Sequence, residues 1–198
     1  IVSKKAAEGI SSLVLDVKFG RGAFMESRDT AVDLARSMVS VSKEMGISAS
    51  AILSTMDQPI GYSIGNSLEI VESVETLCGR GPADLEELVC VLGGMLLKSS
   101  GLSDDLDEGA SRIQDSLYDG TAFEKFLEMV DRQGGDTRIF DSDSSLMRGL
   151  GIFDGDLFST TLETGVGGWV SDIDAMSVAE VCLDLGAGRK SLNDAIDR

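Results

Sequence analysis

The sequence contains no histidine in its 198 residues. Without histidine the chain lacks the commonest general base, the Ser-His-Asp triad and every histidine metal site. Basic residues are also scarce: 17 lysines and arginines stand against 34 aspartates and glutamates, for a formal net charge of −17. Nucleic acids and anionic membranes attract clustered lysine and arginine. We therefore expect no nucleic acid and no membrane among the partners.

Cysteines and long apolar runs are few as well. Cys78, Cys90 and Cys182 show no C-x-x-C spacing and lie in apolar helical patterns. This favours buried free thiols in a reducing compartment over disulfides or a nucleophile. The longest apolar run, residues 89–97, contains two glycines and is far shorter than the roughly 20 residues of a membrane span. The sequence opens without an initiator methionine or a signal peptide, so we expect an internal fragment of a cytoplasmic protein.

A strand–helix–strand unit is predicted near the start of the chain. Residues 13–17 form a short apolar run rich in β-branched residues, as in a strand buried on both faces. An amphipathic pattern from residue 27 to 45 follows, with Ser27 or Asp29 as the N-cap. A second strand is expected at 49–54. Such a unit is almost always a right-handed parallel crossover.

The rest of the chain is predicted to be mainly helical, with helices at 66–78, 83–99, 105–118, 121–133 and 177–185. We expect a linker or exposed loop at 134–145, because glycine, aspartate and serine dominate there. Short strands are expected at 156–163 and 168–174. The predicted fold class is α/β: a mixed sheet flanked by helices, followed by the start of a small α+β C-terminal domain.

The residues alone give weak indications of a site. Residues 20–24 follow a strand and imitate a phosphate loop. They match neither the P-loop nor the full G-x-G-x-x-G pattern, so a tight strand-to-helix turn is the favoured interpretation. Asp16 and Lys18 lie on one face at the strand end, where α/β folds bind ligands, or they form an ordinary ion pair. The acidic runs at 104–108 and 141–143 are most simply solvated loops or helix N-termini.

Several stretches together resemble the thymidine phosphorylase and pyrimidine-nucleoside phosphorylase family. They are Ser3-Lys4-Lys5 with residues 13–25, residues 56–69 and residues 185–189. The resemblance implies that inorganic phosphate attacks the anomeric carbon of a pyrimidine deoxynucleoside and releases the base. It also implies that Lys4 contacts the pyrimidine, where a protonated amine stabilises the charge that builds on the leaving base.

The resemblance further implies a structural cation, K⁺ or Ca²⁺, and no organic cofactor. The positions that match its ligands are the backbone carbonyls of Ile60 and Ser63 and the carboxylate of Glu72. Oxygen ligands of this kind suit a hard cation. Without the resemblance, Glu72 is simply an acidic residue on a helix surface.

The resemblance also implies a domain plan. Residues 1–10 end a helical domain, 11–150 form the α/β domain, and 151–198 begin a truncated C-terminal α+β domain. The family's phosphate loop and its base-contacting arginine and serine precede Ser3, so we expect this fragment alone to be inactive. The full-length protein is expected to be a homodimer.

Two other interpretations stay open. A broader pyrimidine-nucleoside phosphorylase that accepts uridine shares the same motifs, although residues 92–97 and 185–189 look most like the animal-type thymidine enzyme. A non-catalytic protein could also keep the phosphorylase scaffold for binding or assembly.

Overall fold

Two parallel strands and the helix between them form the centre of the structure, a computed structural model that describes residues 2–152 and 160–196. Strand β1 (Ser12–Phe19) pairs in parallel with β2 (Ser48–Thr55), and α2 (Arg28–Glu44) connects them. The predicted strand–helix–strand unit and the α/β class are confirmed. The two described strands are parallel, so the part of the sheet that the structure describes is not mixed.

The two faces of β1 carry different residues, as the period-two alternation of a strand requires. One face packs against α2 and forms an apolar core of Val17, Ala31 and Ala35, surrounded by Leu15, Phe19, Met25, Ala51 and Leu53. The opposite face carries Asp16 and Lys18, which lie beside Ile52 and Ser54 of β2. The core is therefore on the α2 side, and the polar residues are on the other side.

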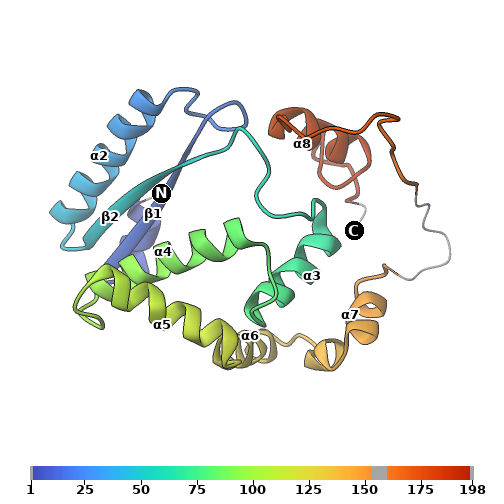
Figure 1. Ribbon diagram of the computed structural model, residues 1–198. Helices are drawn as coiled ribbons and strands as arrows, with labels where there is room; N and C mark the ends of the chain where they lie inside the picture. The colour runs from blue at the N-terminus through green and yellow to red at the C-terminus, as the bar shows by residue number, and fades with distance from the viewer. Residues whose placement is uncertain (1, 153–159, 197–198) are drawn as a thin grey trace.

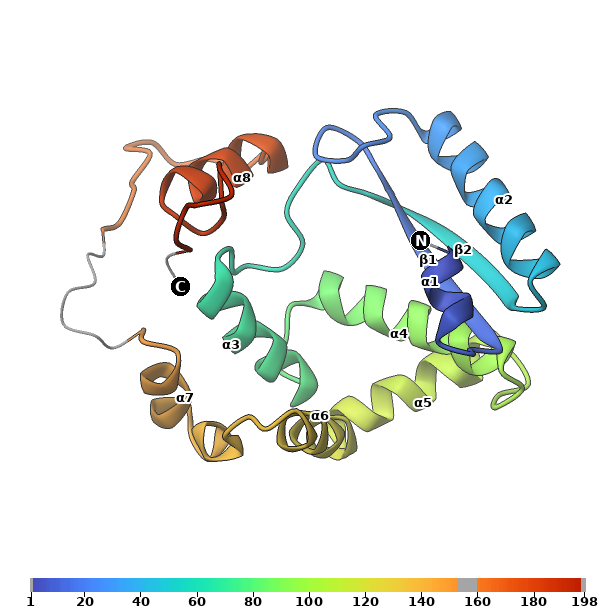
Figure 2. The same cartoon turned by 180° about the vertical axis from the view of Figure 1, so that it is seen from behind.

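The described residues form further helices besides α2. These elements are α1 (Val2–Ala7), α3 (Asn66–Leu77), α4 (Ala83–Ser99), α5 (Leu106–Tyr118), α6 (Thr121–Arg132), η1 (Thr137–Phe140), α7 (Asp143–Gly149) and α8 (Ala175–Asp184). Helix α4 contacts both strands and α5 packs on α4, whereas α2 lies on the other side of the strands (Figure 1). Helix α8 lies near the loops at one end of the sheet in both views (Figure 2). Within residues 2–152 and 160–196, no helix is long and apolar enough to cross a membrane.

Helices α4 and α5 approach each other closely because both carry glycine at the crossing. A Cβ atom on Gly94 would lie 2.6 Å from the backbone nitrogen of Ala110. A Cβ atom on Gly109 would lie 2.7 Å from the carbonyl oxygen of Gly94. Neither contact is compatible with a side chain, so the backbones pack directly against each other.

The prediction of a linker or exposed loop at 134–145 is only partly correct: most of the segment is exposed, but much of it is helical. Asp136 caps the 3₁₀ helix η1 by accepting a hydrogen bond from the Arg138 nitrogen, and Ser142 caps α7 by accepting one from the Ser145 nitrogen. Aspartate and serine at these positions therefore start helices. Phe140 packs edge-to-face on Phe126 of α6, which fixes the segment to the preceding helix.

The predicted C-terminal strands are also corrected. Residues 160–163 and 168–174 are not strands, and the rest of the first predicted strand, 153–159, lies outside the described residues. A strand needs a hydrogen-bonded neighbour, and neither described segment has one. The predicted final helix is confirmed as α8, which begins two residues early because Asp174 caps the Met176 nitrogen.

Replacing Gly94 with alanine should lower the free energy of unfolding by about 1–3 kcal/mol, because the new methyl group collides with backbone. Helix propensity alone would instead favour alanine by about 1 kcal/mol. Urea denaturation measures the sign and size of the change. Glu87→Ala is the control, since Glu87 is exposed on the same helix and should change stability by no more than about 0.5 kcal/mol. A Gly94→Ala protein as stable as the original would contradict the close crossing.

Candidate functional site

A cavity of about 370 Å³ lies beyond the carboxyl ends of β1 and β2. Ligands in α/β folds bind at this edge of a parallel sheet. The walls come from the end of the two strands, the loop at 56–64 and helices α3, α4 and α8. Lys18, Glu69 and Glu72 are its charged residues. Segments that are distant in the sequence therefore line the same cavity.

Glu72 organises the loop that forms one wall of this cavity. Its Oε1 atom accepts hydrogen bonds from the backbone nitrogens of Tyr62, at 2.8 Å, and Ser63, at 2.9 Å. Gly61 has a φ of +72° and lies so close to the Glu72 carboxylate that a Cβ atom there would collide with it. The loop can wrap around the carboxylate only because residue 61 is glycine.

The oxygens expected to hold a cation belong to the loop at 60–63 and to Glu72, around which this loop folds. The described hydrogen bonds leave the backbone carbonyls of Ile60 and Ser63, and the Oε2 atom of Glu72, without a donor. Two carbonyls and one carboxylate oxygen are the donor set of a hard cation such as K⁺ or Ca²⁺. No group of three His, Cys, Asp or Glu side chains within the described ranges could hold a metal. The chemistry of these oxygens is that of a hard-cation ligand set, and such an ion would need further ligands to complete its coordination.

Asp84 is a contributor to this loop that the sequence analysis missed. Its Oδ2 atom accepts a hydrogen bond of 3.0 Å from the Gly61 nitrogen. An acidic residue in the first turn of a helix is common for electrostatic reasons alone. Nothing in the sequence therefore distinguishes Asp84 from an ordinary residue of the α4 N-terminus.

Asp16 and Lys18 form an ion pair, one of the two alternatives open from the sequence. Lys18 Nζ lies 2.7 Å from Asp16 Oδ2 and donates to Ser54 Oγ at 2.8 Å. The Ser54 hydroxyl in turn donates to Asp16. The three side chains thus bind one another through an ion pair and hydrogen bonds on the polar face of the sheet. Lys18 lines the cavity with its charge already balanced.

The turn at Gly20–Phe24 is not arranged as a phosphate loop. Its backbone nitrogens donate to protein oxygens: Gly20 to Met25, Arg21 to Asp57, Gly22 to Met56 and Ala23 to Gly20. A phosphate site needs such N–H groups pointing outward and unoccupied. The tight-turn interpretation is therefore correct for the structure as described.

Lys4 lies elsewhere, exposed on the short helix α1. It is not among the residues that line the cavity at Glu72 or the neighbouring cavity between β2 and α4. The adjacent Lys5 pairs with Glu8 at 3.0 Å, whereas Lys4 has no ion-pair partner within residues 2–152 and 160–196. The structure thus leaves the Lys4 amine available and separate from the candidate cation ligands.

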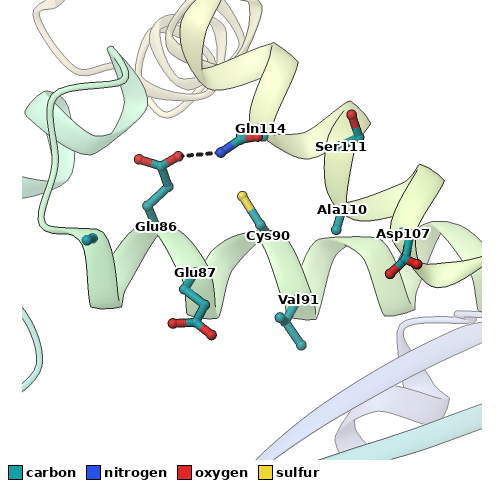
Figure 3. A pocket seen from close by; sticks show the side chains of 9 residues that line it. Glu86, Glu87, Cys90, Val91, Asp107, Ala110, Ser111 and Gln114 are labelled. Carbon is teal, nitrogen blue, oxygen red and sulfur yellow. Dashed lines mark hydrogen bonds between the residues drawn. The ribbon is translucent and has the colours of Figure 1, made fainter.

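Another groove runs beside the crossing of α4 and α5 and is lined by residues of both helices. Figure 3 shows Cys90 pointing into it. Glu86 accepts a hydrogen bond of 2.9 Å from Gln114 across the groove (Figure 3). Burial raises the pKa of the Cys90 thiol, and Glu86 adds to this effect. A raised pKa disfavours the nucleophilic thiolate. All three cysteines are free, as predicted, but only Cys90 is buried, whereas Cys78 and Cys182 are partly exposed.

Comparisons with known proteins agree with the resemblance seen in the sequence. A family model described as glycosyl transferase family, a/b domain, matches residues 1–123. Pyrimidine-nucleoside phosphorylases of Bacillus subtilis, Geobacillus stearothermophilus and Staphylococcus haemolyticus are 40%, 39% and 37% identical to the chain over 197 residues. Each alignment covers 100% of this chain and 44% of the relative. The chain therefore spans less than half the length of these curated relatives.

The family model covers more than half of the chain, and the similarity to the phosphorylases extends along all of it. The chain belongs to the glycosyl transferase family, with residues 1–123 matching its a/b domain, and its predicted likeness to the pyrimidine-nucleoside phosphorylases is confirmed.

Proposed function

We propose that the protein containing this chain cleaves pyrimidine nucleosides with inorganic phosphate, and that thymidine is its substrate. The observation that carries the proposal is the 40% identity over 197 residues to a relative named pyrimidine-nucleoside phosphorylase. A phosphate oxygen forms a bond to the anomeric carbon while the bond from that carbon to the base nitrogen breaks. The bonding electrons leave with the base, whose nitrogen takes up the proton that the phosphate loses. The products are thymine and 2-deoxyribose 1-phosphate.

Lys4 would stabilise the leaving base. Negative charge grows on the pyrimidine as its bond to the sugar breaks, so a cation beside the base carbonyl binds the transition state more tightly than the substrate. Lys4 is exposed and has no ion-pair partner in the described part of the chain. Its charge is therefore free to interact with a bound base.

A K⁺ or Ca²⁺ ion would be held by the Ile60 and Ser63 carbonyls and by Glu72. Bound there, the ion would supply positive charge that fixes the loop at 60–63. The chain's own part is to present these oxygens together: Glu72 accepts from the Tyr62 and Ser63 nitrogens through one oxygen and leaves the other for the ion. Because Lys4 does not line this cavity, the ion would have a structural role.

The full-length protein should release thymine from thymidine only when phosphate is present. Thymine release is followed by absorbance or chromatography, with a reaction lacking phosphate as the control. Uridine added as a competitor tests the breadth of the activity, since a broad pyrimidine-nucleoside phosphorylase would cleave both. A folded full-length protein that releases no thymine would contradict the proposal and favour a non-catalytic scaffold.

Lys4→Ala in the full-length protein should lower thymidine phosphorolysis by about 10²–10³-fold, because the positive charge that stabilises the departing base is lost. The melting temperature should hardly change, since Lys4 is exposed. Lys5→Ala is the matched control: it removes the same charge one residue away, where Glu8 is the partner. Wild-type turnover in Lys4→Ala would remove Lys4 from the site.

Glu72→Gln should abolish the stabilisation that added K⁺ or Ca²⁺ gives, while leaving the ion-free protein nearly as stable as before. Glutamine can still accept from the Tyr62 and Ser63 nitrogens but no longer offers a charged oxygen to the ion. Thermal unfolding with and without each cation measures this. Glu69→Gln, one turn earlier on α3, is the control, because Glu69 accepts from the Gly65 nitrogen. An unchanged response to cation in Glu72→Gln would refute the site.

A further inference from the structure

Arg21 joins the turn after β1 to the segment that leads into α8. Its guanidinium donates two hydrogen bonds to the Asp172 carboxylate, Nη1 to Oδ2 at 2.9 Å and Nη2 to Oδ1 at 2.7 Å. A two-pronged pair of this kind fixes the orientation of both groups as well as their distance. The two residues are 151 positions apart in the sequence, so the pair connects two distant parts of the chain.

Asp57, in the loop after β2, completes the same junction. Its Oδ1 atom accepts from the Arg21 backbone nitrogen at 2.8 Å, and its carbonyl oxygen accepts from the Ala175 nitrogen at 3.0 Å. Gly22 packs directly against the loop after β2, since a Cβ atom there would lie 2.7 Å from the Met56 carbonyl oxygen. The turn after β1, the loop after β2 and the start of α8 thus form one hydrogen-bonded unit.

The charge states of the carboxylates favour this junction. The hydrogen bonds from the Arg21 side chain lower the pKa of Asp172. The hydrogen bond from the Arg21 backbone nitrogen, helped by the Thr55 hydroxyl, lowers the pKa of Asp57. Both aspartates are therefore anionic at neutral pH, as the interaction with Arg21 requires.

Helix α8 has little else to hold it. None of its residues is buried, and it packs closely on no other helix or strand within the described ranges. Beyond the junction at Arg21, Asn66 donates one hydrogen bond of 3.1 Å to the Ala187 carbonyl that follows the helix. Yet Ala175, Val178 and Ala179 of α8 line the cavity that contains Glu72. The position of this wall depends on polar contacts at the N-terminus of α8.

We propose that Arg21 is a positioning residue: by holding Asp172 and Asp57 it fixes α8 over the end of the sheet and so sets the α8 wall of the Glu72 cavity. The use of this cavity for a cation rests on the proposed function. The attachment of α8 through Arg21 does not depend on it.

Hydrogen–deuterium exchange of the full-length protein tests the attachment directly. Peptides covering residues 173–180 should exchange about two- to fivefold faster in Arg21→Ala, as expected when an exposed ion pair holds a segment that opens locally. Asp172→Asn should have the same effect, and the double variant should exchange no faster than either single variant. Arg21→Lys keeps the charge without the paired geometry and should fall between Arg21→Ala and the unaltered protein.

Arg36→Ala is the matched control, because Arg36 is an exposed arginine whose carboxylate partner, Asp33, lies on its own helix at 3.9 Å. It should leave exchange at 173–180 unchanged. Unaltered exchange at 173–180 in Arg21→Ala would overturn the proposal. Faster exchange that extends through β1 and β2 would also overturn it, because it would indicate general destabilisation.

The cavity wall is tested by the response to K⁺ and Ca²⁺ alone. In Arg21→Ala, the cation concentration needed for a given rise in melting temperature should increase about fivefold or more, a size typical of coupling between sites. An unchanged concentration would overturn the role in shaping the cavity. If the unaltered protein releases no thymine when phosphate is present, the proposed function is refuted. The exchange result does not depend on that outcome.

Discussion

Asp57 is the group on which the arrangement around the sheet end depends. Its carboxylate holds the turn after β1 through the Arg21 nitrogen, and its carbonyl holds the first residue of α8. The parallel register of β1 and β2 makes this possible, because it brings the two loops to the same edge of the sheet. Gly20 leaves room for the Asp57 carboxylate, which a Cβ atom would strike. The position of α8, and with it one wall of the cavity at Glu72, follows from this junction.

Much of the fold could be predicted because helix starts and caps are determined by residues that are close together in the sequence. The helix from residue 66 and the helix from residue 83 begin where the sequence indicates, and Ser27 caps α2 as expected. The segment at 134–145 was misjudged because aspartate and serine favour loops and helix caps alike. Phe140 packs on Phe126 and holds this segment against α6, a contact that the local sequence pattern does not indicate. The strand expected at 168–174 depends on a neighbouring strand, which a local pattern cannot supply.

The candidate site could be predicted only in part, and mainly through the family resemblance. From residue type alone Glu72 is one of 34 acidic residues, and its role at the loop depends on two backbone nitrogens nine and ten positions earlier. The bond between Arg21 and Asp172 spans 151 positions, with no periodicity to connect them. Asp84 cannot be singled out from the sequence, because acidic residues are common in the first turn of a helix. Such contacts depend on tertiary structure, so a single sequence gives no direct indication of them.

The separation of Lys4 from Glu72 bears on how a phosphorylase would use this domain. Lys4 stands exposed on α1, whereas the oxygens of Ile60, Ser63 and Glu72 surround a cavity that Lys4 does not line. A cation in that cavity would therefore act on the loop and not on the charge of the departing base. The paired carbonyls and the single carboxylate match such a structural task, because they hold a hard ion without offering it an acid or a base. In the proposed function, then, transition-state stabilisation belongs to Lys4, and the Glu72 cavity supplies the rigidity of the sheet end.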